Sequence, residues 1–235
     1  MLQAAAADGD QLERMLARRA AGEPLEQVLG WAEFCGLRIA VAPGVFVPRR
    51  RTELLVERAV QLLGHRKRPV VVDLCCGTGA IGVAIADRLE VELHATDLDP
   101  DAVACARQNA TTGEVHEGDL YDALPAGLRG RVDLLAVNAP YVPTDQIRLM
   151  PPEARLHEHH VALDGGADGL DLHRRAAAGA PAWLRPEGAL LIETSQAQAE
   201  RTAAACADAG LRPRILSQDE SRLVEALAPS VSVHP

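Results

Sequence analysis

Two short segments of this sequence combine residue types that could bind a small ligand and act on it. The first segment, Asp73–Gly79 with the sequence DLCCGTG, directly follows an apolar run at 70–72 and directly precedes a predicted helix. Ligands bind beyond the carboxyl ends of parallel strands, where a turn of small residues lets the backbone approach a nucleotide closely. The segment therefore predicts a nucleotide- or nucleoside-binding turn.

The type of nucleotide is indicated by the acidic residues around this turn. Gly77, Gly79 and Gly82 match GxGxxG, which by itself is a weak signal for a dinucleotide. However, Asp73 begins the turn, and S-adenosylmethionine, which has a sulfonium cation and no phosphate, suits an acidic strand end better than a pyrophosphate does. Asp97 ends the next predicted strand, where an acidic residue binds ribose hydroxyls in either cofactor class. We interpret this as an S-adenosylmethionine site; helix capping by the two aspartates is the alternative.

The second segment is Asn138-Ala139-Pro140-Tyr141, which follows the predicted strand 132–137. An amide nitrogen is a poor nucleophile because its lone pair is delocalised, so an enzyme that methylates it must accept its two hydrogens and fix its geometry. The side-chain oxygen of Asn138 and the carbonyl of Ala139 can accept them, and Tyr141 offers a flat face to a planar group. Positioning and matched acceptors would supply most of the catalysis. An ordinary turn is the alternative.

Alternating strands and helices position both segments from Pro69 onward. Strands are predicted at 70–74, 91–96, 114–117, 132–137 and 189–194, followed by two closing strands. Helices are predicted at 80–89, 99–109, 170–180 and 196–209. This alternation predicts the α/β class, with a doubly wound, seven-stranded and mostly parallel Rossmann-like sheet.

A small N-terminal arm is expected over residues 1–66, before the catalytic domain over 67–235. It contains a predicted helix at 11–20 and a hairpin formed by the apolar runs 28–34 and 37–41. A linking helix follows, with Thr52 as its N-cap.

Composition disfavours several classes of partner. The 33 acidic and 24 basic residues give a net charge of -9, which makes nucleic acid an unlikely partner. The five cysteines show neither zinc-site spacing nor the density of a disulfide scaffold. His157, His159 and His160 lack a ligand at zinc-site spacing, so we interpret them as a polar loop. Without a signal peptide or an apolar run of about 18 residues, we expect a cytoplasmic protein with no metal and no membrane contact.

Taken together, the motifs resemble the protein-(glutamine-N(5)) methyltransferases, the HemK/PrmC family, which methylate a glutamine side chain of peptide-chain release factors. The resemblance begins at Gly22 and includes 46–53, the glycine turn, the Asp119 segment, Asn138–Tyr141 and 162–170. It implies a class I methyltransferase fold, S-adenosyl-L-methionine as cofactor, and a protein substrate with an exposed glutamine, such as a release factor. It assigns catalysis to Asn138, Ala139, Pro140 and Tyr141, and cofactor binding to Asp73, Cys75, Cys76, Gly77, Thr78, Gly79, Asp97, Leu98, Asp119, Leu120 and Asn138, with Arg49, Thr52 and Glu53 bordering the pocket.

Three other functions remain open at this point. The same cofactor could serve methylation of a small metabolite or of adenine in nucleic acid, and the literal GxGxxG could serve an NAD-dependent oxidoreductase. The sequence does not determine the methyl acceptor or the oligomeric state.

The acceptor motif of the family has proline where this chain has Ala139, which yields a first prediction. If only the carbonyl of residue 139 is used, Ala139→Pro preserves methyl transfer, because proline keeps the carbonyl and fixes φ near about −65°. If the N–H of Ala139 binds a different substrate, the variant loses turnover, at a cost on the order of 1–3 kcal/mol, without losing cofactor affinity. Steady-state rates and cofactor titrations of both proteins separate the two cases.

Overall fold

A seven-stranded sheet forms the centre of the computed structural model, with the strand order β5-β4-β3-β6-β7-β9-β8. The structure describes residues 1–230; the last five residues of the expected catalytic domain lie outside this part. The strands are β1 (Trp31–Phe34), β2 (Leu37–Ala40), β3 (Val70–Leu74), β4 (Glu92–Asp97), β5 (Glu114–Glu117), β6 (Val132–Val137), β7 (Leu184–Thr194), β8 (Arg212–Gln218) and β9 (Ser221–Leu227). The helices are α1 (Leu2–Ala5), α2 (Gly9–Ala20), α3 (Leu25–Leu29), α4 (Glu53–Leu63), α5 (Ala80–Arg88), α6 (Pro100–Asn109), α7 (Pro152–His157), α8 (Asp171–Trp183) and α9 (Ala199–Asp208).

The strand order has its topological switch point between β3 and β6. These neighbours are parallel, and the last residues of the two strands, Leu74 and Val137, are paired. β4 pairs with the other side of β3, and only β9 runs antiparallel to its neighbours in this sheet. The chain segments that follow β3, β4 and β6 therefore emerge at one edge, as required for a ligand site at a switch point.

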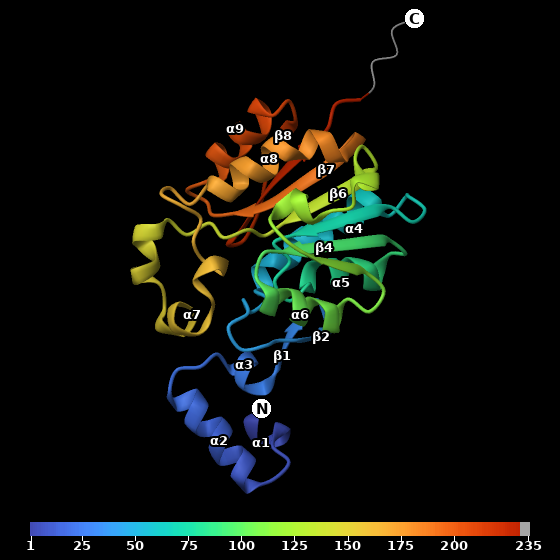
Figure 1. Cartoon of the computed structure of the whole chain (residues 1–235). Coiled ribbons are helices and arrows are strands. Elements are labelled where there is room, and N and C mark those ends of the chain that lie inside the picture. The colour runs from blue at the N-terminus through green and yellow to red at the C-terminus, as the bar shows by residue number, and fades with distance from the viewer. Residues whose placement is uncertain (231–235) are drawn as a thin grey trace, which may run out of the picture.

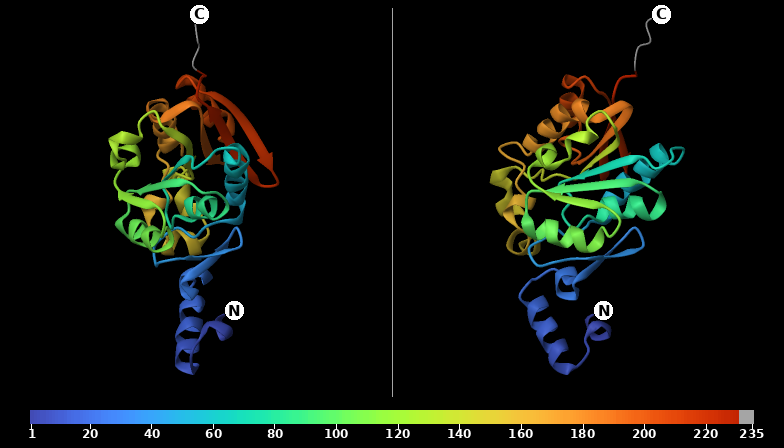
Figure 2. Two further views of the ribbon diagram at one scale, coloured as in Figure 1. Left: turned by 90° about the vertical axis from the view of Figure 1, so that its right-hand side faces the viewer. Right: turned by 45° about the vertical axis from the view of Figure 1, so that its right-hand side comes forward.

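Helices cover both faces of this sheet, which explains why every residue of β3 is buried. On one face, α4 and α5 pack against alternate strand residues such as Val71 and Leu134. On the other face, α8 and α9 pack against Val72 and Leu135. The two layers are visible in the turned views of Figure 2. The predicted α/β class and mostly parallel sheet are confirmed.

The N-terminal arm extends away from the sheet, with α1 to α3 at the foot of the molecule (Figure 1). Its hairpin, β1 paired with β2, reaches back to α6. There the side chain of Asn109 accepts a hydrogen bond from the Ala40 N–H and donates to the Ala40 carbonyl, both at 2.9 Å. The same amide donates to the carbonyl of Thr78 in the glycine turn at 2.9 Å, so one side chain joins the hairpin to that turn.

Several expected element ends differ from the structure, including the start of β7 at Leu184 instead of residue 189, and three expectations failed for a local reason. Val28 belongs to α3, which ends at Gly30 with φ 77°, so the first hairpin strand starts only at Trp31. Thr52 does not cap α4 with its side chain, because a preceding 3₁₀ turn gives it helical angles. The helix expected from residue 196 begins at Ala199, because the Gln198 side chain binds the carbonyls of neighbouring loops instead. Among residues 1–230, no helix has the length and apolarity needed to cross a membrane.

The buried His173 in α8 yields a prediction about acid stability. Its Nδ1 lies 3.0 Å from the Thr202 hydroxyl, and burial lowers its pKa from 6.5 to about 4. As the pH falls from 6.5 toward about 4, His173 binds a proton in the unfolded chain but not in the native state, so the free energy of unfolding decreases. Urea unfolding followed by circular dichroism should show this loss, with an upper limit of roughly 3 kcal/mol, and His173→Gln should reduce it. The exposed His65→Gln variant is the control. If the free energy of unfolding depends on pH equally in the two variants, His173 is not the cause of the loss.

Candidate active site

A cavity of about 740 Å³ lies at the carboxyl edge of β3, β4 and β6. Its wall contains the glycine turn, the end of β4, the loop after β6 and the segment 160–166. The two segments singled out in the sequence therefore share one cavity. Of the predicted site residues, it is lined by Cys75, Cys76, Gly77, Thr78, Asp97, Leu98, Asp119, Leu120, Asn138, Ala139, Pro140, Tyr141 and Thr52.

The glycines of the turn have distinct packing roles. Gly77, with φ 54°, faces open space, since an added Cβ would meet nothing within 4 Å. A Cβ on Gly79 would lie 3.3 Å from Ala106 of α6, and one on Gly82 would lie 2.8 Å from Leu93 of β4. Two of the three GxGxxG glycines thus allow helix and strand packing, which accounts for the pattern without a dinucleotide.

Two carboxyl groups, from the partly buried Asp97 and the buried Asp73, support the turn and the start of α5. Asp97 accepts hydrogen bonds from the N–H groups of Gly77 at 2.8 Å and Asp99 at 3.0 Å, and burial raises its pKa. Asp73 lies behind the turn and does not line the cavity; one of its oxygens accepts from the Gly82 N–H at 2.9 Å. Burial raises the pKa of Asp73 to about 8. Asp73 therefore supports the turn, whereas Asp97 also faces the cavity.

The wall beyond Asp97 combines apolar and acidic groups. The Leu98 side chain is exposed, while Leu120 is buried with φ 47°, an unusual angle for a leucine. Asp119 accepts a hydrogen bond from Arg175 at 2.7 Å. This part of the cavity wall thus places apolar side chains beside a carboxylate, a combination that suits a nucleoside base next to a ribose.

The loop Asn138–Tyr141 follows β6 and carries the predicted acceptor motif, so we call it the acceptor loop. It is held by residues from distant elements. The Asn138 amide nitrogen lies 3.4 Å from the Thr52 hydroxyl, and the Ala139 side chain is buried in the core. Arg51 donates to the Tyr141 hydroxyl at 2.6 Å and to the buried Glu193 carboxylate at 3.1 Å. Arg51 was not among the predicted site residues, because both of its partners lie far along the chain.

The loop 162–170 supports the acceptor loop from the other side. The Gly165 N–H donates to the Val142 carbonyl at 2.9 Å, and the Gln198 side chain donates to the Tyr141 carbonyl at 2.9 Å. A Cβ on Gly165 would lie 2.8 Å from the Tyr141 Cα, so only glycine fits this approach. Gln198 gave no signal in the sequence because its partners lie far along the chain.

Three further predicted residues lie outside the cavity wall: Gly79, Arg49 and Glu53. Arg49 pairs with the buried Glu158 at 2.6 Å, and Glu53 accepts a hydrogen bond from the Cys35 N–H at 3.3 Å. Next to Glu158, the Nδ1 of His159 lies 2.6 Å from the Asp99 carboxylate. The sequence analysis interpreted His159 as part of a polar loop and did not predict this contact.

The charged side chains of the cavity wall distinguish between a dinucleotide and S-adenosylmethionine as the cofactor. The guanidinium groups in its described wall belong to Arg51 and Arg175, and each already binds a carboxylate. Asp97, Asp119 and Asp164 add negative charge. A pyrophosphate would meet repulsion here, whereas a ribose diol and the cationic sulfonium and ammonium groups of S-adenosylmethionine fit. The role of each individual residue stays a prediction.

Solved structures place the fold among S-adenosylmethionine-dependent methyltransferases. A T. thermophilus 16S rRNA methyltransferase, solved in complex with AdoMet and guanosine, is similar with a TM-score of 0.62 at 20% identity, covering 84% of this chain and 49% of that chain. At this identity the similarity shows the fold. The fold is therefore the class I methyltransferase fold, with the cavity at its switch point.

Sequence relatives define the family more closely. Residues 36–158 match the family model described as "Methyltransferase small domain". A "Release factor glutamine methyltransferase" of Geobacter sulfurreducens is 40% identical over 79% of this chain and 66% of its own length. One of the same name from Cereibacter sphaeroides is 39% identical over 94% of this chain and 80% of its own length. The chain belongs to the release factor glutamine methyltransferase family, although it spans slightly less than two thirds of the Geobacter protein.

Asp97→Ala tests the cofactor end of the cavity. We expect at least about tenfold weaker binding of S-adenosylhomocysteine by calorimetry, because a hydrogen bond to a charged group contributes about 1.5–3 kcal/mol. Asp101→Ala, an exposed carboxylate in the first turn of α6, is the control and should bind normally. Unchanged affinity in Asp97→Ala would show that Asp97 stabilises the turn but does not bind the cofactor.

Proposed function

We propose that this chain transfers a methyl group from S-adenosylmethionine to the side-chain amide nitrogen of a glutamine in a peptide-chain release factor. The observation that carries the proposal is the shared cavity, in which the Asn138–Tyr141 loop lies beside the glycine turn. The names of the relatives support the same acceptor.

In this proposal the acceptor loop orients the glutamine amide. The Asn138 side-chain oxygen and the Ala139 carbonyl accept its two N–H hydrogens, while the Tyr141 ring lies against its plane. Because Arg51 holds the Tyr141 hydroxyl, the ring is fixed before the substrate arrives. Acceptors that are preorganised for the developing positive charge on nitrogen lower the barrier without reorganisation. The methylated nitrogen is acidic and loses its proton readily, so no strong base is required.

The cofactor end is assigned residue by residue. The cavity-lining part of the turn, Cys75–Thr78, would enclose the methionine part, Asp97 would bind the ribose hydroxyls, and Leu98 and Leu120 would contact the adenine. S-adenosylmethionine, when bound, supplies an electrophilic methyl group on its sulfonium. Because Asn138 lines the same cavity, we expect the bound methyl group to lie next to it.

The arm over residues 1–66 and the catalytic domain over 67–235 would share substrate binding. The buried Gln27 side chain of α3 donates to the carbonyls of Val45, at 3.2 Å, and His157, at 3.0 Å. These contacts place the arm beside α7, next to the segment 160–166 of the cavity wall (Figure 1). A docked protein could therefore touch both the arm and the cavity rim, and the net charge of -9 favours a protein over nucleic acid.

Asn138→Ala tests the proposal directly. We expect loss of methyl transfer to a purified release factor, with moderately weaker cofactor binding and an unchanged fold, because the side chain orients the acceptor. Mass spectrometry locates the added methyl group, and a release factor lacking the glutamine should receive none.

The exposed Asp145→Ala variant, in the loop beyond Tyr141, should retain full activity. More than half of the wild-type rate in Asn138→Ala would contradict the amide-clamp mechanism. Methylation of RNA or of a small metabolite instead of the release factor would contradict the proposed substrate.

A further inference from the structure

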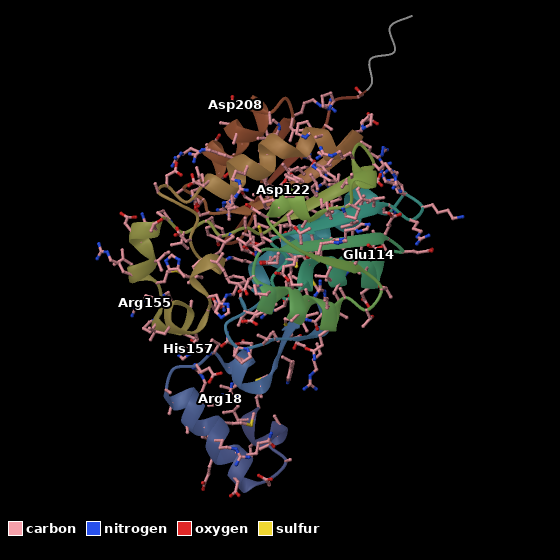
Figure 3. All side chains as sticks on the ribbon, viewed as in Figure 1. Arg18, Glu114, Asp122, Arg155, His157 and Asp208 are labelled. Carbon is pink, nitrogen blue, oxygen red and sulfur yellow. The ribbon has the colours of Figure 1, made fainter. Side chains whose placement is uncertain are left out.

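A cluster of imidazole and carboxylate groups lies on β4 and β5, away from the active site. In the parallel register, His94 is paired with Glu114 and Thr96 with His116. Side chains two residues apart on a strand share a face, so His94, Glu114 and His116 project from the same side of the sheet. Figure 3 marks Glu114 beside β4, on the side opposite α7.

The ligand atoms of these three side chains converge on one point. His94 Nδ1 and His116 Nε2 lie 3.2 Å apart. The Glu114 Oε2 lies 3.9 Å from each of these nitrogens. Zinc binds imidazole at about 2.0–2.1 Å, which in a tetrahedral site separates two nitrogens by about 3.3 Å. The two imidazoles therefore already have the spacing of a metal pair, and a small rotation of Glu114 completes it.

Exposure and neighbours also fit a metal site that is open to solvent on one side. The His94 side chain is 6% exposed, and Glu114, at 69% exposed, has freedom to adjust. The carboxylate of Glu92 lies 3.5 Å from His94 Nε2, where it can accept that N–H and leave a lone pair on Nδ1.

We propose that His94, Glu114 and His116 form a binding site for a divalent first-row transition metal, with zinc favoured by the two-imidazole, one-carboxylate donor set. Three protein ligands leave a fourth position for water. His94, Glu114 and His116 do not line the active-site cavity. The site is thus separate from the proposed activity.

The position of the site indicates what the metal does. β5 has only four residues and is an edge strand, paired with β4 alone. It leads directly to Gly118 and Asp119, which line the cavity. An ion bound by His94 of β4 and by Glu114 and His116 of β5 would cross-link the two strands. This cross-link would stabilise the edge of the sheet next to the cavity.

The experiment measures metal binding by the full chain, independently of methyl transfer. The chain is treated with a chelator, dialysed, and titrated with zinc by calorimetry and with cobalt by absorption spectroscopy. We expect one saturable site per chain and cobalt bands typical of nitrogen and oxygen ligands, without the sulfur charge-transfer bands that cysteine ligands produce. His116→Ala and Glu114→Gln should each weaken binding at least tenfold, and Glu92→Gln roughly 10–100-fold.

The controls distinguish this site from the rest of the chain. His65→Ala removes an exposed imidazole, and His159→Asn disrupts the group that it forms with Asp99 and Asp101; both should bind zinc as the wild type does. Circular dichroism and S-adenosylhomocysteine binding verify the fold of each variant. The absence of saturable binding, full affinity in His116→Ala, or loss of binding in His159→Asn would overturn the proposal and leave His94 and His116 as a hydrogen-bonded pair.

Discussion

The parallel pairing of β3 with β6 determines where everything else in the site lies. Because the ends of these two strands are paired, the glycine turn and the Asn138–Tyr141 loop start side by side at one edge of the sheet. Connections from these strands then pass to opposite faces, α5 to one and the 143–170 segment toward α8 on the other, which opens the cavity between them. A different strand order would separate the cofactor turn from the acceptor loop, whatever their sequences.

The acceptor loop obtains its rigidity from outside itself. With Ala139 at its second position, its backbone is less restricted than a proline at that position would make it. The loop is fixed instead by three contacts: Arg51 on the Tyr141 hydroxyl, Gln198 on the Tyr141 carbonyl, and Gly165 against the Tyr141 backbone. Since Arg51 itself rests on the buried Glu193, the loop is connected to the end of β7, a rigid part of the sheet.

The sequence predicted the sheet, the main helices and the cavity-lining segments, because these depend on local periodicity and on motifs of adjacent residues. It did not predict contacts that only the folded chain creates. Arg51 and Glu193 are 142 residues apart, and Gln198 and the Tyr141 carbonyl are 57 apart. The prediction that the Thr52 side chain caps α4 was wrong because its hydroxyl contacts Asn138, a residue far along the chain. Its residue type and position are those of a helix cap. His94 and His116 meet only through the strand register, which no local pattern reveals.

The three hydrogen bonds of the Asn109 amide have a thermodynamic consequence. They connect the Ala40 backbone of the arm hairpin to the Thr78 carbonyl of the cofactor turn, so a displacement of either one alters the bonding of the other. Coupling of this kind is reciprocal: if binding at one place changes affinity at the other by some factor, the reverse effect has the same size. A ligand that displaces the arm hairpin and a ligand that displaces the turn would therefore influence each other through this one side chain, without a domain motion.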